Sequence, residues 1–401
     1  MNALDEAKSL GNYMAELREY FHAHPELGLK EYNTCKKIQE ELDKYKIKNY
    51  RIKETNVIAE IDSGKPGKTD KPGKTLFLRA DIDALPIQEA NEVPYKSQND
   101  RIMHACGHDG HAAYMLGAAR LIKNHQANFY GKVIIAFQAA EEIGKGARDI
   151  IAAGVLDNVD RTFGIHFQSG MELGKIGVKA GADMASCDRF LIKITGKAGH
   201  ITVPQNCVDP IFIASQISAQ LQTVVSRLIS PVEGALIGVG RIQSGTTYNI
   251  IPRTAEIEGT IRAFTKESRK KLQDAITKIS ENVASEYGGK AEVQIEDICD
   301  ACFNDEQAAK EVEESSIKLV GKENTLTNLE KRFGSDNFAD YFRKAPGCYI
   351  HVGSSNSEST RWVHHNEHFD LARESVVFAA GLALQYTLDF LKNPENGGKS
   401  C

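Results

Sequence analysis

A stretch of nine residues, 103–111, gathers the side chains with the clearest chemical potential in this sequence. It reads MHACGHDGH and holds three of the twelve histidines of the chain, one cysteine and one aspartate. Thiolates and imidazoles are the ligands that zinc and similar divalent metals prefer. Cys106 and His108 are two positions apart and would point the same way on an extended segment, while Gly107 and Gly110 permit a tight turn. The stretch predicts a metal site; the alternative is a polar loop around a buried cysteine.

Carboxylates follow two apolar segments that we expect to form buried strands. The segment 75–80 ends in two aspartates, and the segment 132–137 leads through Gln-Ala-Ala into two adjacent glutamates. In open α/β sheets, functional groups gather at the carboxyl ends of strands. Adjacent carboxylates beside apolar residues are costly unless cations compensate for their charge, so the pattern indicates either a metal pair or a solvated acidic loop. The four carboxylates are Asp81, Asp83, Glu141 and Glu142.

Histidines occur in two further places of interest. A third apolar segment, 162–167, carries His166 near its end, and residues 362–368 form a cluster that includes His364 and His365. A lone histidine in an apolar strand is more often a hydrogen-bonded core residue than a ligand. His166, however, is near the end of the third predicted strand to carry a potential metal ligand, after the two strands that end in carboxylates. Three such strand ends favour a shared metal site.

The order of the predicted elements indicates one domain inserted into another. Apolar strands alternate with helical patterns in the first and last parts of the chain, which is typical of an α/β fold, and a helix over 112–123 follows the metal-binding stretch. The middle part shows the βαββαβ order of a ferredoxin-like unit. We therefore expect a mostly parallel central sheet flanked by helices, interrupted by a smaller α+β domain, with segments 1–184, 185–302 and 303–401.

Length and composition limit the class of protein. At 401 residues the chain is too long for one ordinary core. Its net charge of −5 and sequence pI near 6.2 argue against a dedicated nucleic-acid binder. No apolar run approaches the roughly 20 residues of a membrane helix, and the charged N-terminus has no signal-peptide core. We therefore expect a cytoplasmic protein with no membrane partner.

The eight cysteines are spread along the chain without the spacing of a disulfide framework. Cys299 and Cys302 form one Cys-x-x-Cys pair. A structural zinc site of the common type needs a second such pair, and the sequence has none. The pair is therefore interpreted as two reduced cysteines at a strand end, with a redox role as the alternative.

Together, these motifs resemble in content and order those of the aminoacylase/carboxypeptidase family of dinuclear metallohydrolases. Within that family, the chain is similar to the branch of hippurate hydrolases, indole-3-acetyl-amino-acid hydrolases and N-acetyl-diaminopimelate deacetylases, whose metal motif contains the cysteine. The resemblance extends over nearly the whole chain. The motifs that carry it are LRADIDALP (78–86), CGHDGH (106–111), Glu141-Glu142, GIH (164–166), GKAGH (196–200), NIIP (249–252), GTIR (259–262) and VHH (363–365).

The resemblance implies two divalent metal ions per subunit, either zinc, manganese, cobalt or nickel. Glu141 takes the position of the general base, and Asp81 that of an acid that steadies a metal-binding histidine, as outer contacts of metal ligands do. Arg79 stands where other branches have a metal-site histidine. The last ligand is His364 or His365, and we favour His364. The implied ligands are Cys106, His108, Glu142, His166 and His364.

The resemblance also implies that the inserted domain pairs two protomers and acts as a lid. In it, His200, Asn249 and Arg262 match residues that contact the substrate. His200 and Asn249 suit hydrogen-bond donation to a developing oxyanion, and Arg262 suits bidentate capture of a substrate carboxylate. Asn249 is alternatively a turn residue before Ile-Ile-Pro, and Arg262 an exposed cross-strand partner.

The chemistry that these residues permit is amide hydrolysis. Divalent metals lower the pKa of water from 15.7 toward ~7, and a neighbouring carboxylate can move the proton to the leaving nitrogen. We predict a metal-dependent amidohydrolase that converts small N-acyl-amino acids, such as N-acetyl or N-benzoyl derivatives, to a carboxylic acid and a free amino acid. A dipeptidase or carboxypeptidase of the same family is the alternative. A metal-free binding protein is disfavoured because every ligand position is intact.

Overall fold

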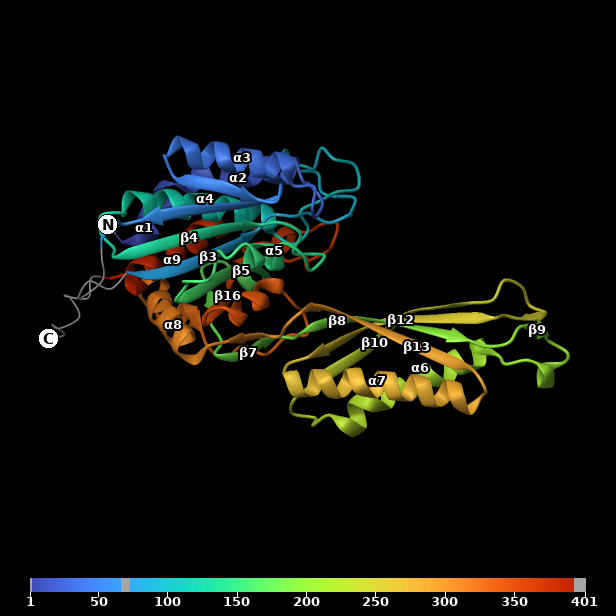
Figure 1. The fold of residues 1–401 in the computed structure, drawn as a ribbon. Helices are drawn as coiled ribbons and strands as arrows, with labels where there is room; N and C mark the ends of the chain where they lie inside the picture. The colour runs from blue at the N-terminus through green and yellow to red at the C-terminus, as the bar shows by residue number, and fades with distance from the viewer. Residues whose placement is uncertain (1, 66–72, 393–401) are drawn as a thin grey trace. The chain divides into compact units, whose positions relative to one another are not determined.

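The computed structural model describes residues 2–65 and 73–392. Its contacts divide the chain into two units. The first comprises Met1–Gly181, Phe303–Glu330 and Asp336–Cys401, and the second comprises Ala182–Cys302 and Lys331–Ser335. The second unit is thus inserted into the sequence of the first; Figure 1 shows the elements of each.

An eight-stranded mixed sheet forms the centre of the first unit, in the order β1-β2-β4-β3-β5-β16-β6-β15. The inner strands β4, β3, β5 and β16 run parallel to one another, and antiparallel pairs occur toward the edges. The inner strands are largely buried, as expected for parallel strands covered on both faces. The predicted mostly parallel sheet is confirmed. The strands are β1 Lys48–Ile52, β2 Asn56–Asp62, β3 Lys74–Asp81, β4 Gly131–Gln138, β5 Arg161–Glu172, β6 Ile176–Gly177, β15 Thr325–Leu326 and β16 Gly347–Ser355.

Helices α2, α4 and α9 pack on one another in the first unit (Figure 1). The approach of α2 to α4 is close, because a Cβ added at Gly117 would lie 2.2 Å from the sulfur of Met14. No helix among the described residues is long and apolar enough to cross a membrane. The helices of this unit are α1 Ala3–Ser9, α2 Gly11–Ala23, α3 Tyr32–Lys44, α4 His108–Asn124, α5 Ala147–Ala152, α8 Glu306–Val320 and α9 Ser375–Phe390, with a 3-10 helix, η4, at Asn337–Arg343.

Helix α4 begins at His108, four residues before the predicted start at residue 112. Gly107 precedes it with φ +92°, a left-handed conformation that glycine adopts at little cost. The chain therefore turns from Cys106 directly into the helix. The segment from Cys106 to His108 is not extended, and the tight turn that the glycines permit occurs at Gly107.

The second unit has the predicted βαββαβ order, with an antiparallel sheet β10-β12-β8-β13. Its core lies between the sheet and two helices, where Phe190, Ile192 and Ile194 of β8 are fully buried. Asp209 caps the first helix by accepting a hydrogen bond from Ile211 N–H at 2.8 Å. The elements are β8 Cys187–Thr195, α6 Pro210–Leu228, β10 Ala235–Ser244, β12 Thr254–Ala263, α7 Lys266–Glu286 and β13 Lys290–Cys299, with a small pair of strands, β9 Gly199–His200 and β11 Ile250–Ile251.

Candidate metal centre

The carboxyl edge of the inner strands is where the predicted ligands converge. β3 and β4 end side by side, with Asp81 opposite Gln138, so the segment with Glu141 and Glu142 leaves the sheet beside Asp81. His166 lies on β5, the neighbour of β3 on the other side. Parallel strands place these ends at one edge of the sheet, although the residues are far apart in the sequence.

The ligand atoms lie close to one another around Cys106 and His108. Cys106 Sγ is 3.5 Å from His166 Nε2 and 3.9 Å from His364 Nδ1. His108 Nε2 is 3.9 Å from Glu142 Oε1. Ligand atoms of Cys106, His108 and His166 all lie within 4.8 Å of one another. The structure thus brings the five implied ligands together.

The chemistry of these atoms fits a divalent cation. Nε2 of His108, Oε1 of Glu142 and Nε2 of His364 are buried and make no hydrogen bond. Such atoms are costly without a partner, and a bound cation would give them one. Burial lowers the pKa of His364 to about 3 and the pKa of His166 well below its usual value. Both imidazoles are therefore neutral, which is the form that binds a metal.

Both histidines of the final motif reach the cluster. His364 packs its ring against that of His166, with centroids 5.1 Å apart, in addition to its approach to Cys106. The side chain of His365 is 52% exposed, and its Nε2 lies 3.3 Å from Glu142 Oε1. The more buried His364, with its unsatisfied nitrogen, remains our preferred ligand.

Buried aspartates orient the histidines of the site. His108 Nδ1 lies 3.0 Å from the carbonyl oxygen of Asp83 and 3.2 Å from its carboxylate, so Asp83 fixes this ring. Asp81 instead lies 2.5 Å from His111 Nδ1 and accepts a hydrogen bond from Arg79 at 2.6 Å. Its closest approach to a predicted ligand is 3.5 Å, to His108 Nε2. The sequence grouped Asp83 with the strand-end carboxylates but singled out Asp81, not Asp83, as the residue that steadies a metal-binding histidine.

Glu141 lies beside the ligands with one oxygen held in place. Its Oε1 accepts a hydrogen bond from the backbone N–H of Asn337 at 3.1 Å. Burial, followed by the negative charges of Asp336 and Glu142, raises the pKa of Glu141 well above its usual range. Its place beside the candidate ligands, with one oxygen held by Asn337, is what a general base at this site needs. Asp336 and Asn337 were not singled out in the sequence.

The other three predicted site residues belong to the second unit. His200 is exposed and lies opposite Ile250 in the β9–β11 pair, and Ile201 N–H donates to the carbonyl oxygen of Asn249 at 3.2 Å. His200 and Asn249 are therefore close together. Arg262 lies near the opposite end of β12, where its Nη1 donates to Ser335 Oγ at 2.5 Å. The structure therefore places His200 beside Asn249 and places Arg262 at the other end of the strand β12.

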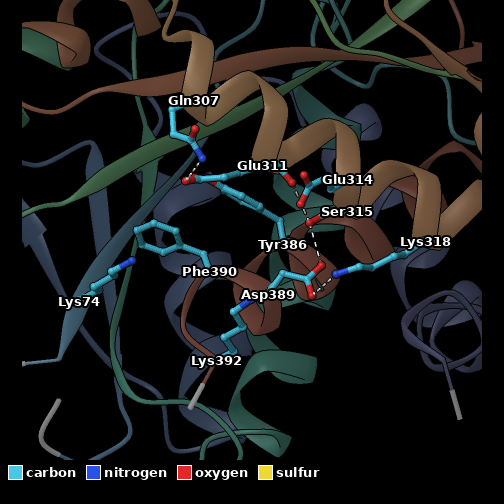
Figure 2. Close-up of a pocket in the computed structure, with 10 residues that line it drawn as sticks. All are labelled: Lys74, Gln307, Glu311, Glu314, Ser315, Lys318, Tyr386, Asp389, Phe390 and Lys392. Atoms are coloured by element: carbon cyan, nitrogen blue, oxygen red, sulfur yellow. Dashed lines mark hydrogen bonds and ion pairs between the residues drawn. The ribbon is translucent and has the colours of Figure 1, made fainter. Parts of the chain in front are cut away.

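A polar pocket of about 250 Å³ lies elsewhere on the first unit, along α8 and α9 (Figure 2). Three of its charged groups form ion pairs: Lys318 Nζ is 2.7 Å from Asp389 Oδ1, and Glu311 binds Arg161 through two contacts of 3.0 Å. None of the predicted site residues lines this pocket. It is therefore separate from the metal centre.

Comparison with known proteins places this site in a family. Residues 77–387 match the sequence profile of Peptidase family M20/M25/M40. The chain is 40% identical over 375 residues to the N-acetylcysteine deacetylase of Bacillus subtilis strain 168, covering 93% of this chain and 95% of that protein. It is 36% identical to Thermostable carboxypeptidase 2 of Saccharolobus solfataricus, covering 88% of this chain and 89% of that protein. A crystal structure of a dinuclear metal-binding peptidase of the M20 family from Bacillus subtilis has a TM-score of 0.82 at 35% identity, covering 96% and 99%.

The chain therefore belongs to Peptidase family M20/M25/M40 and is a hydrolase of that family with a divalent-metal site. The family resemblance predicted from the motifs is confirmed.

Proposed function

We propose that this protein hydrolyses the amide bond of N-acyl-amino acids and releases a carboxylic acid and a free amino acid. The observation that carries the proposal is the cluster in which the candidate ligands and Glu141 meet at one edge of the sheet. The relative from Bacillus subtilis named N-acetylcysteine deacetylase supports an N-acyl-amino acid as the substrate class.

The proposed cofactor is a pair of divalent ions per subunit, with zinc, manganese, cobalt and nickel as the candidates. Cys106, His108, Glu142, His166 and His364 would hold them. When bound, these ions supply the positive charge that lowers the pKa of water and polarises the amide carbonyl.

Glu141 is the residue of this chain that we assign to proton transfer. Its carboxylate accepts a proton from the attacking water and returns it to the leaving nitrogen. The hydrogen bond from Asn337 N–H holds the carboxylate in one orientation while it does so. Asp81 and Asp83 fix His111 and His108, which keeps the walls of the site rigid.

The separation of residues in the second unit supports a homodimer. His200 and Asn249 lie just beyond the Thr254 end of β12, and Arg262 lies eight residues further along that strand. At the usual rise of a strand, eight residues span roughly 26 Å. A small N-acyl-amino acid cannot touch both ends at once. If both ends contact a substrate, His200 and Arg262 at one site come from different protomers.

A dipeptidase or carboxypeptidase is the second candidate, favoured by the relative named as a carboxypeptidase. Both reactions cleave an amide next to a free carboxylate, which Arg262 suits. They differ in whether the other side of the bond is a simple acyl group or an amino-acid residue.

A substrate screen tests the choice between these activities. The metal-loaded protein should hydrolyse N-acetyl, N-benzoyl or indole-acetyl amino acids faster than dipeptides or C-terminal residues of longer peptides. Release of the free amino acid is measured with zinc, manganese, cobalt and nickel in turn. Faster cleavage of the peptides would select the second candidate, and no hydrolysis of any amide with any of the four metals would contradict both.

Mixed dimers test the role of His200. We expect His200→Ala and Glu141→Gln homodimers to be nearly inactive, and subunit exchange between them to restore part of the activity. The mixed dimer pairs the intact metal site of one protomer with the intact His200 of the other, so one of its two sites is complete. Activity is measured after mixing, with native mass spectrometry to confirm exchange. Mixed dimers without regained activity would place His200 in its own protomer's site or outside catalysis.

A further inference from the structure

The segment that carries Glu141 and Glu142 follows an unfavourable backbone path. Ala140 has φ +56°, a left-handed conformation that a residue with a side chain adopts rarely, and Gly144 and Gly146 also have positive φ, at +65° and +62°. For Ala140, such a conformation persists only where the surrounding structure holds it, whereas the two glycines adopt theirs at little cost. The placement of the two glutamates therefore depends on what binds this segment, residues 139–146.

Side chains from distant parts of the first unit accept hydrogen bonds from the N–H groups of segment 139–146. Asn56 Oδ1 accepts from residue 139 at 3.0 Å, Glu31 Oε1 from residue 140 at 2.8 Å, and Asp83 Oδ2 from residue 142 at 3.0 Å. Each of these three side chains accepts one hydrogen bond from the segment.

Asn337 differs because it makes two hydrogen bonds within the segment and two more to residues of the neighbouring strand ends. Its Oδ1 accepts from Gln138 Nε2 at 2.8 Å and from Arg79 Nη2 at 3.2 Å. Its Nδ2 donates to the carbonyl oxygen of Lys145 at 2.7 Å. Its backbone N–H donates to Glu141 Oε1 at 3.1 Å. One residue, 1% exposed, thus joins the strand end before the segment, the far side of the segment and the carboxylate of the proposed base.

We propose that Asn337 is a positioning residue that sets the placement of Glu141 and Glu142 toward the metal centre. The primary amide meets the need for an acceptor facing Gln138 and a donor facing Lys145 on one short side chain. Aspartate has nearly the same shape but no donor, and it would set a carboxylate oxygen against the carbonyl oxygen of Lys145. The catalytic consequence rests on the proposed function, whereas the effect on metal binding and on segment 139–146 does not.

The test compares Asn337→Asp and Asn337→Ala with the wild-type protein and with Asn304→Ala. Asn304 is a suitable control because it is also buried in the first unit and makes hydrogen bonds of 2.7–2.9 Å to backbone groups of Lys179 and Tyr349, outside segment 139–146. Metal affinity is measured by chelator competition, backbone opening by hydrogen exchange of peptides covering 139–146, and activity as separate kcat and KM.

We expect both Asn337 variants to bind metal about 10–100-fold more weakly, the usual effect of losing an outer contact of a metal site. At saturating metal we expect kcat to fall by a similar factor with little change in KM, because the base is displaced while substrate contacts remain. Hydrogen exchange of the backbone amides in segment 139–146 should be faster than in the wild-type protein. Asn337→Asp, which keeps the size of the side chain, should show the same pattern and guards against a simple packing defect in Asn337→Ala.

Metal affinity, exchange and kcat in both Asn337 variants equal to those of Asn304→Ala would overturn the inference. Failure of the wild-type protein to hydrolyse any N-acyl-amino acid would instead overturn the proposed function. In that case, the metal affinities and exchange rates of the Asn337 variants still decide whether Asn337 holds the segment.

Discussion

Removal of the divalent metal will abolish amide hydrolysis, and adding metal back will restore it. Nε2 of His108, Nε2 of His364 and Oε1 of Glu142 are buried without a hydrogen bond, and a bound cation would give each of them a partner. A general base alone contributes about 10²–10⁴-fold, so without the metal charge the activated water and the polarised carbonyl are both lost. The measurement is activity after chelation and dialysis, with elemental analysis of the same sample, followed by titration with zinc, manganese, cobalt and nickel.

Substitutions of single ligands separate a metal effect from damage by the chelator. Cys106→Ala and His166→Ala should each lower the metal content of the folded protein, because their side chains meet at 3.5 Å in the cluster. Cys35→Ala is the matched control, since Cys35 is fully buried and donates to the carbonyl oxygen of Thr55, outside the cluster. Full activity in protein shown by elemental analysis to be free of metal would contradict a metal-dependent reaction.

The sheet and the inserted unit were predictable because their signals are local. Apolar runs such as 75–80 and 132–137 mark buried strands, and parallel strands place their carboxyl ends at one edge. The motif residues at those ends, Asp81, Glu141 and His166, therefore had to lie near one another. The βαββαβ order of the second unit follows in the same way from alternating strand and helix patterns.

The contacts that orient the site were not predictable, because their partners are distant in the sequence. Asn337 meets Glu141 across 196 positions and Gln138 across 199, and no periodicity marks such a pair. Likewise, whether Asp81 or Asp83 contacts His108 depends on where the end of β3 lies relative to the start of α4, and the sequence does not show this. The distance between His200 and Arg262 also emerges only from the strand register.

Glu141→Gln is expected to keep the metal and lose most of the activity. Glutamine has the shape of glutamate, and its Oε1 can still accept the hydrogen bond from Asn337 N–H. Its amide, however, does not take up a proton from water at neutral pH. We expect kcat to fall by a factor of about 10²–10⁴, the range for general acid–base catalysis, while metal content and KM change little. Steady-state kinetics give kcat and KM, and elemental analysis of the same preparation gives the metal content.

Glu142→Gln is the control that gives this result its meaning. Glu141 and Glu142 both place a carboxylate oxygen within 4.8 Å of a nitrogen of His108, so distance alone does not distinguish the base from the ligand. Their contacts do: Glu141 Oε1 accepts a hydrogen bond from the backbone N–H of Asn337, whereas Glu142 Oε1 faces the histidine nitrogens, 3.3 Å from His365 Nε2 and 3.9 Å from His108 Nε2. The substitution at Glu142 should therefore reduce metal affinity, and the one at Glu141 should reduce kcat at full metal loading. The opposite pattern, with metal lost from Glu141→Gln and retained by Glu142→Gln, would exchange the two roles.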